Sequence, residues 1–405
     1  MKKNYILILI ITAAPFILTT CYPTQKTQQT SAQRTSVSVK EKNIFFEKTS
    51  AGIIKFFMKD DSEIEIYFTV DISSQRNFND SDNIQVLFFP EKNPTQPLYE
   101  SKCQKQITSE YLSGKFSITT PLTSGKYIVK IINLKTAQDI TIQEYFNGNT
   151  PENYFMMTDS NGFMPVQSYV PVYKTIRFEK NKNMSLLLYR KTNDPPFPPP
   201  PFIENYTPQE NNWSLVCSLN RDTAMTFSEP ASFIVKDKQM RFIYGFLVVH
   251  DAFPNIYNEK EMIEATRYIM NKDEFNRCYY SEDRKKEIEL FWKNVGGSKE
   301  RARELIRQYY NRVIDANRFF SDYTAPGFKT DRGMIYIIFG NPDHIYKTTQ
   351  SEIWHYGKNE DKSIVNFTFL YKNGEYLLER SSVYKDYWYQ MVDNWRQGKI
   401  YVFDR

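Results

Sequence analysis

The chain has 405 residues, with 52 lysines and arginines against 47 aspartates and glutamates, and a formal net charge of +5. This balance excludes binding to nucleic acid by charge alone, because such binding needs a concentrated basic face. The length exceeds what one hydrophobic core supports and predicts two to four domains, while the 30 phenylalanines and 29 tyrosines favour strands and large contact surfaces.

The first twenty residues have the layout of an export signal. Lys2 and Lys3 precede an apolar run, Tyr5–Leu18, which at 1.5 Å per residue is roughly 21 Å long and too short to span a bilayer core of ~30 Å. The run ends in Leu18-Thr19-Thr20-Cys21, which resembles a lipobox, whose cysteine is acylated before cleavage. We therefore expect a signal peptide, 1–20, and a lipid anchor on Cys21. A cleaved secretory peptide with an incidental Cys21 is the alternative.

Polar composition predicts a flexible tether at residues 21–40, because this segment has almost nothing that a core can bury. No acidic residue follows Cys21 closely, so we expect the anchor to face the periplasm, in the outer membrane. From 41 to 145, apolar and polar residues alternate, as in Ile64–Val70, and turn signals separate the strands. This spacing predicts an antiparallel β-sandwich-like domain.

Strands continue through residues 146–255, which we interpret as a second β-rich region. It contains the Pro-rich linker 194–202 (DPPFPPPPF), where prolines remove backbone donors and impose polyproline-II geometry. Two interpretations of this linker stay open: a stiff spacer, and a docking peptide for an aromatic groove.

Helical periodicity starts near residue 258 and predicts a third unit, 256–405. Asn258 and Ser281 are expected N-caps. Gly296-Gly297-Ser298 separates two helices, and apolar residues then recur at intervals of three and four from Ala302 to Phe320, which predicts a long amphipathic helix.

The end of the chain predicts a small antiparallel sheet. Met334–Phe339 is apolar on both faces, which predicts a central strand. Strands are expected at Ile353–Tyr356 and Val365–Tyr371, followed by a type I′ hairpin at Asn373-Gly374 and a closing amphipathic helix, Tyr387–Trp395. The predicted fold class is therefore multidomain α+β, with β-sandwich-like regions first and then a helical segment packed on a small C-terminal sheet.

No pattern in the sequence indicates catalysis. The chain has no HExxH, GxSxG or Walker motif, and its three histidines, His250, His344 and His355, have no partner at metal-ligand spacing. We therefore expect a non-enzymatic protein without cofactor or metal.

Cysteine usage allows two interpretations. In an oxidising periplasm Cys103 and Cys217 can form a disulfide. The other interpretation is that these two residues and Cys278 are buried, unpaired thiols.

A resemblance to a known family rests on Pro326-Gly327-Phe328-Lys329-Thr330-Asp331-Arg332-Gly333. This segment resembles the GWxTD domain family, named for its Gly-Trp-x-Thr-Asp core, with Phe328 at the position of the family's tryptophan. Matching context extends over about residues 287–382 and includes Leu290-Phe291-Trp292-Lys293, Tyr309-Tyr310, Asn317, Ile335-Tyr336-Ile337, Phe339-Gly340, Pro342-Asp343 and Ile353-Trp354. The resemblance implies an exported protein, often a lipoprotein, with β-rich regions before the domain and no known activity. It also implies the outer-membrane type IX secretion machinery as a partner, with which some relatives are associated.

The motif has a structural interpretation. Gly327 can take a positive φ, and Thr330 and Asp331 can bond nearby backbone N–H groups. Gly333 provides clearance, and the ring of Phe328 is expected to fill the junction between helix and sheet.

Arg332 completes the candidate site. In the structural interpretation it pairs with Asp331 or with another carboxylate. The functional interpretation is an exposed Asp331/Arg332 site for a ligand or a partner. Both interpretations stay open at this stage.

The expected function is that of an envelope lipoprotein, a protein-interaction or structural subunit on the periplasmic side of a membrane. The membrane, through Cys21, and envelope proteins are the expected partners, and nucleic acid is not. The alternative is a glycan- or peptidoglycan-binding module, because exposed Tyr and Trp rings can stack on sugars.

Overall fold

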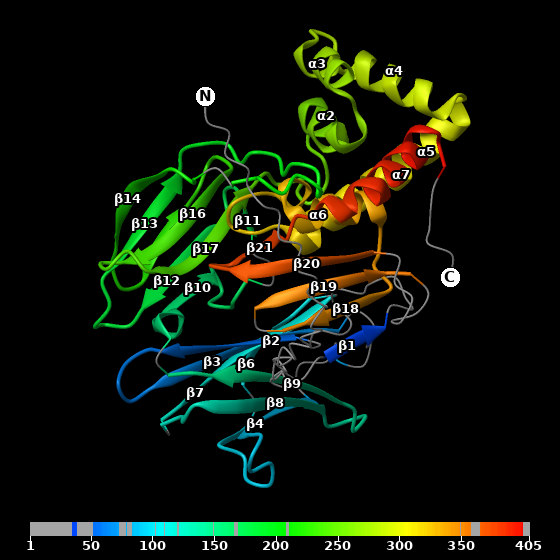
Figure 1. Ribbon diagram of the computed structural model, residues 1–405. Helices are drawn as coiled ribbons and strands as arrows, with labels where there is room; N and C mark the ends of the chain where they lie inside the picture. Colours follow the sequence, from blue (N-terminus) through cyan, green and yellow to red (C-terminus); the bar gives the residue numbers. More distant parts are fainter. Residues whose placement is uncertain are drawn as a thin grey trace, which may run out of the picture. The chain divides into compact units, whose positions relative to one another are not determined.

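Figure 1 shows the computed structural model, which describes residues 35–38, 52–72, 78, 83–101, 103–108, 110–119, 121–148, 150–165, 169–207, 210–348, 350–357 and 365–399. These residues belong to one unit, Thr35–Arg405. The predicted signal peptide, Cys21 and most of the predicted tether lie outside the described residues. Within the described part of the chain, none of the helices has the length and apolar character needed to cross a membrane.

The first module is a sandwich of two antiparallel sheets. One sheet has the order β2-β3-β7-β6, formed by Gly52–Met58, Ile64–Asp71, Tyr111–Ile118 and Gln104–Ile107. The other has the order β5-β4-β8-β9, formed by Tyr99–Ser101, Ile84–Pro90, Gly125–Asn133 and Asp139–Phe146. Phe56, Phe88 and Tyr127 belong to the apolar core of this module. The predicted β-sandwich-like domain is confirmed.

Strand β3 is more buried than the alternation of apolar and polar residues in Ile64–Val70 indicates. Its alternating residues Ile66, Phe68 and Val70 are buried, but Tyr67 on the other face is buried too. Tyr67 packs in a separate cluster with Phe57 and with Met156 of the next module. Alternation therefore identified the core face correctly, while contacts with a distant part of the chain covered the second face.

The second module also has two sheets, after a short 3₁₀ turn, η3 (Pro151–Tyr154). The smaller sheet, β10-β12-β15, is formed by Phe155–Asp159, Thr175–Lys180 and Thr223–Thr226. The larger, β11-β17-β16-β13-β14, is formed by Tyr169–Pro171, Phe242–Val249, Ala231–Asp237, Leu186–Lys191 and Trp213–Leu219. Only the β11–β17 pair is parallel among the strands described here. The predicted second β-rich region is confirmed as an apolar core enclosed by strands.

The Pro-rich linker lies against the helical part of the chain. Phe197 and Phe202 pack on its apolar core, and the backbone N–H of Ser381 donates to the Pro201 carbonyl oxygen (3.1 Å). The linker is therefore held along its length by the chain's own C-terminal block.

A helical layer follows. It consists of α2 (Glu259–Thr266), η4 (Arg267–Ile269), α3 (Lys272–Tyr280), α4 (Arg284–Gly296) and α5 (Lys299–Phe320). Asn258 caps α2 as predicted, accepting from the Glu261 N–H (3.0 Å). The predicted cap Ser281 is wrong: Asp283 caps α4 instead, by accepting from the Lys286 N–H. The predicted long helix is confirmed as α5, which Ser298 caps.

The prediction of a central strand at Met334–Phe339 is wrong. These residues belong to α6 (Asp331–Phe339), which follows η5 (Gly327–Lys329). Every residue from Gly333 to Phe339 is buried, so this part of the helix has no exposed polar face. An apolar run of this length fits a buried helix as well as a buried strand, and periodicity cannot separate the two. Thr330 caps the helix, with its side chain accepting from the Gly333 N–H.

The last sheet has the order β1-β18-β19-β20-β21 and is antiparallel throughout. Its strands are Thr35–Ser38, from the predicted tether, then His344–Lys347, Ser351–Tyr356, Val365–Lys372 and Glu375–Leu378. Asn373 (φ 50°) and Gly374 (φ 86°) make the predicted hairpin. After η7 (Ser382–Tyr384), the predicted closing helix is present as α7 (Lys385–Arg396). Figure 1 shows α6 and α7 beside this sheet, and the predicted α+β class is confirmed.

The three cysteines that the structure describes are free thiols. Cys103 and Cys278 are buried and Cys217 is partly exposed. Burial raises the pKa of the Cys103 thiol to about 11. The prediction of buried, unpaired thiols is confirmed for Cys103 and Cys278, whereas Cys217 is unpaired but not buried, and the alternative Cys103–Cys217 disulfide is wrong.

Candidate functional site

The motif loop connects α5 to α6 through a tight turn. Asp322 closes the turn, since its Oδ1 accepts from the Thr324 N–H (2.8 Å), the Thr324 hydroxyl (2.6 Å) and the Ala325 N–H (3.1 Å). Burial raises the pKa of Asp322, although these hydrogen bonds oppose the shift. The chain then enters η5, which positions the residues of the motif.

Both motif glycines are required by close backbone contacts. A Cβ on Gly327 would lie 1.8 Å from the Ala316 carbonyl oxygen, and one on Gly333 would lie 1.8 Å from the Gly327 carbonyl oxygen. Gly327 does not use the positive φ that a glycine allows, because in the described structure its φ is not positive. The clearance expected at Gly333 is confirmed.

Thr330 and Asp331 fix the start of α6. The Thr330 hydroxyl accepts from the Gly333 N–H (3.1 Å) and donates to the Gly327 carbonyl oxygen (3.0 Å). Asp331 accepts from the Leu378 N–H (2.9 Å) and forms a two-point pair with Arg380, whose nitrogens lie 2.5 and 3.2 Å from the carboxylate oxygens. The two paired side chains are only 6% and 7% exposed. Asp331 therefore joins the helix to β21 from inside the protein.

Arg332 points to a different carboxylate. Its guanidinium lies 3.3 Å from Glu352 and 3.9 Å from the centre of the Tyr376 ring. Burial opposes ionisation of Glu352, but the charges of Arg332 and Lys347 outweigh it and lower the pKa of Glu352. The structure thus separates Asp331 from Arg332, and each has its own buried partner.

Phe328 is 3% exposed and lies in the core that helices and sheet share. Its N–H donates to the Asn317 side-chain oxygen (3.1 Å), and its carbonyl oxygen accepts from the Tyr268 hydroxyl (2.6 Å). Its ring centre lies 6.3 Å from that of Phe197 in the Pro-rich linker. The aromatic residue of the motif therefore packs at the contact between linker and helices.

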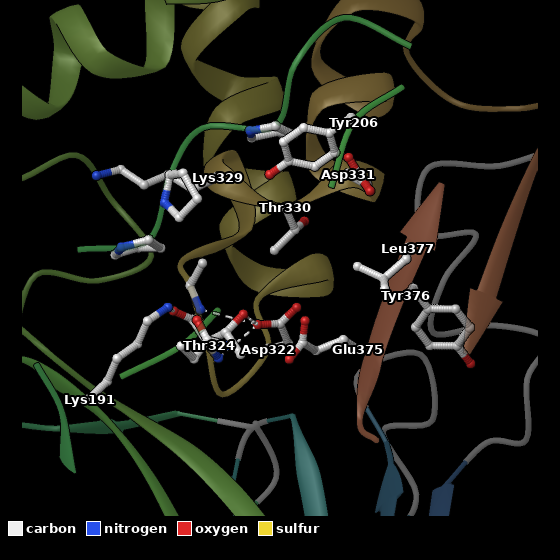
Figure 2. A pocket seen from close by; sticks show the side chains of 15 residues that line it. Lys191, Tyr206, Asp322, Thr324, Lys329, Thr330, Asp331, Glu375, Tyr376 and Leu377 are labelled. Atoms are coloured by element: carbon white, nitrogen blue, oxygen red, sulfur yellow. Dashed lines mark hydrogen bonds between the residues drawn. The ribbon is translucent and has the colours of Figure 1, made fainter. Parts of the chain in front are cut away.

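A cavity of about 100 Å³ lies next to the motif. Figure 2 shows the carboxylates of Asp322 and Glu375 side by side, with Lys191 reaching toward Thr324 and Asp331 on the opposite side near Tyr206. The Lys191 ammonium donates to the Thr324 carbonyl oxygen (3.3 Å). Three prolines of the linker also line the cavity: Pro195, Pro196 and Pro198.

Glu375 is the most perturbed acid in this cavity. Burial and the charge of Asp322 raise the pKa of Glu375 to about 7, against the hydrogen bond from the Tyr323 hydroxyl (2.8 Å) and the charge of Lys191. Burial also lowers the pKa of Lys191. The arrangement can exchange a proton near neutral pH.

The histidines do not form a metal site with other potential ligands in the described residues. His344 and His355 face each other across the β18–β19 pair, and His250 lies 3.5 Å from Glu261. In the described ranges, no three His, Cys, Asp or Glu side chains are grouped so as to hold a metal ion.

Sequence reasoning missed several residues that complete the site. Arg380, Glu352 and Glu375 come from segments far from the motif, and no local pattern marks them. Asn317 belongs to the matching context, but the sequence did not show that it accepts a hydrogen bond from the Phe328 N–H. Lys191 lies just before the Pro-rich linker, and its role follows only from the contact between the second module and the motif loop.

One comparison with known protein families concerns this region. Residues 231–397 match the model of the GWxTD domain. The match begins at β16 and extends through α7, so it is wider at both ends than the motifs alone indicated. No curated protein matches the chain.

Proposed function

From the premise that residues 231–397 form a GWxTD domain, we propose that the protein is a non-enzymatic lipoprotein of the cell envelope. In this proposal Cys21 carries the lipid anchor. The folded modules extend into the periplasm, where they bind protein partners. The sequence Leu18-Thr19-Thr20-Cys21 after a short apolar run supports the anchor.

The observation that supports an interaction role is that the charged residues of the motif pair with other residues of the same chain. Asp331 is paired with Arg380 and Arg332 with Glu352, and of these four side chains Arg332 is the most exposed, at 14%. The motif therefore supports the fold, and contacts with other molecules fall to the surface around it. The same domain exposes large aromatic side chains, including Tyr257 just before α2, which is 60% exposed. Aromatic residues are enriched in protein interfaces.

The resemblance to exported relatives supports a more specific partner. Some members of the family are associated with the outer-membrane type IX secretion machinery. We propose that an assembly of this kind, on the periplasmic side of the outer membrane, is where the protein binds.

Two measurements test the proposal. Cys21→Ser is expected to abolish incorporation of a labelled fatty acid and to move the protein from the membrane fraction to the soluble periplasmic fraction. A photo-reactive phenylalanine analogue at Tyr257 is expected to crosslink a discrete envelope protein in living cells, whereas the same analogue at Tyr173, on the second module, serves as the matched control. Unchanged labelling in the Cys21 variant contradicts the anchor. Equal crosslinking patterns at the two tyrosines contradict a specific interface on the helical layer.

Glycan binding is a second candidate function. A cleft of about 790 Å³ is lined by the aromatic residues Tyr244 and Tyr371, by Asn373 and by the cations Lys55 and Arg332. Tyr371 is 46% exposed, so its ring is available to stack on a sugar. Sedimentation with purified peptidoglycan tests this candidate, and Tyr371→Ala is expected to weaken binding at least several-fold. Unchanged sedimentation of that variant contradicts it.

A further inference from the structure

A groove larger than the motif cavity and the cleft lies where the Pro-rich linker meets α3 and α7. Its volume is about 900 Å³, and it is separate from the motif cavity. We call it the aromatic groove and define it by Phe197, Phe202, Arg267, Phe275, Tyr280 and Tyr389. The linker's prolines form part of its wall.

Arg267 is the central charged group of the aromatic groove. Its guanidinium carbon lies 5.1 Å from the centre of the Phe197 ring and 5.0 Å from that of Phe275. The side chain is exposed, and in the described part of the chain no ion pair involves it. Two aromatic neighbours restrict the rotamers of an arginine while leaving its N–H groups available for a bidentate acceptor.

The other charges of the groove leave it cationic. Arg396 is neutralised by Glu274, with nitrogen–oxygen distances of 2.7 and 3.0 Å. Lys272 and Arg267 face a single acidic lining residue, Asp393. This excess favours a ligand that carries a carboxylate.

The same groove has the aromatic composition of a binding hot spot. Tyr280 is 76% exposed and Tyr389 is 48% exposed, while Trp388 beneath them is buried. Phe202 lies 5.3 Å from Tyr389, ring centre to ring centre. Tyr, Trp and Arg are the residues that most often dominate the energetics of protein interfaces.

We propose that the aromatic groove binds an extended acidic segment of a partner protein, in which a carboxylate pairs with Arg267 and an apolar neighbour packs on Tyr280 and Tyr389. This inference rests on the proposed interaction function and names the surface and the chemistry of the partner. A lipid surface fits less well, because polybasic lipid-binding clusters have about four to eight cations, and only two cations of this groove lack an ion pair within the described residues.

The test measures fluorescence anisotropy of labelled ten-residue peptides with the purified full-length chain in detergent. Three peptides share a proline- and phenylalanine-rich sequence and differ only in two positions, which are Glu, Gln or Lys. We expect the Glu peptide to bind at least tenfold more tightly than the Gln peptide and the Lys peptide to bind most weakly. Arg267→Gln is expected to remove the preference for Glu, and Arg267→Lys to retain part of it. The matched control is Arg307→Gln, which changes an exposed arginine on α5, outside the groove. This variant should bind like the unaltered protein.

Specific outcomes overturn the inference. Equal affinities for the Glu and Gln peptides, or an undiminished preference in Arg267→Gln, exclude the pairing with Arg267. Binding of phosphatidylglycerol vesicles that Arg267→Gln abolishes, without peptide binding, assigns the groove to a membrane surface instead. The peptide measurement uses purified protein, so its result stays valid even if Cys21 carries no lipid. Conversely, a negative peptide result does not affect the crosslinking test of the proposed function.

Discussion

The two sides of the motif cavity each contain an acidic residue, and the partners of the two carboxylates differ. On the motif side, Asp331 has a cation and a backbone N–H as partners, from Arg380 and Leu378. On the hairpin side, Glu375 has a tyrosine hydroxyl as its hydrogen-bond donor and another acid, Asp322, as a close neighbour. The first carboxylate is paired with a cation, whereas the pKa of the second rises to about 7.

This difference shows which acid stabilises the fold and which one responds to pH. A buried charge with a matched partner is costly to disturb, because removal of one partner leaves the other uncompensated. A buried acid without a matched cation tends to become neutral instead. Four predictions test this comparison.

Asp331→Ala is expected to have the largest effect, toward the upper end of about 3–5 kcal/mol of unfolding free energy, because it leaves Arg380 buried without its partner. Urea denaturation followed by circular dichroism measures the change. In the double variant Asp331→Ala/Arg380→Met, part of the loss is expected to return. A loss below about 1 kcal/mol, the size of a helix-cap effect, contradicts the buried pair.

Phe328→Ala is expected to cost about 3 kcal/mol, the lower part of the range for buried phenylalanines, since the ring is 3% exposed and packs on Phe197. Phe328→Trp restores the family's residue and is expected to cost less than the alanine change. Melting temperatures of both variants measure the order. Unchanged stability in Phe328→Ala rules out a packing role.

Glu375 is expected to make stability depend on pH. A carboxyl whose folded-state pKa is raised contributes stability that is fully present below its unfolded pKa and is lost as pH rises through the folded pKa. For Glu375 the window runs from its ordinary value of 4.5 to about 7. Glu375→Gln should therefore gain on the order of 1–3 kcal/mol relative to the unaltered protein between pH 5 and pH 8. Denaturation curves of Glu375→Gln and of the unaltered protein measure this difference. The same difference in unfolding free energy at pH 5 and at pH 8 argues against a raised pKa of Glu375.

Thr330→Ala is expected to have the smallest effect, about 1 kcal/mol, because it removes the helix cap and the hydrogen bond to Gly327 without leaving a buried charge. Thr330→Ser keeps the hydroxyl and is the control, with a smaller loss expected. A cost for Thr330→Ala as large as that of Asp331→Ala means that the two residues act as one unit rather than separately.

Local patterns in the sequence determined much of the fold. Alternation located the strands of the first module, the three- and four-residue repeat located α5, and Asn373-Gly374 located the last hairpin, because positive φ at both positions is a local requirement. The GWxTD match was also visible in the sequence, although its extent was underestimated.

Tertiary structure decided the state of α6 and the partners of the motif. Met334–Phe339 is buried on every side, so its sequence has no polar face from which a period can be read. Asp331 and Arg380 are far apart in sequence, and so are Arg332 and Glu352, so each pairing depends on how α6 packs against the last sheet. The same packing decides the ionisation of Glu375, since a pKa depends on burial and neighbouring charge rather than on the residue type alone.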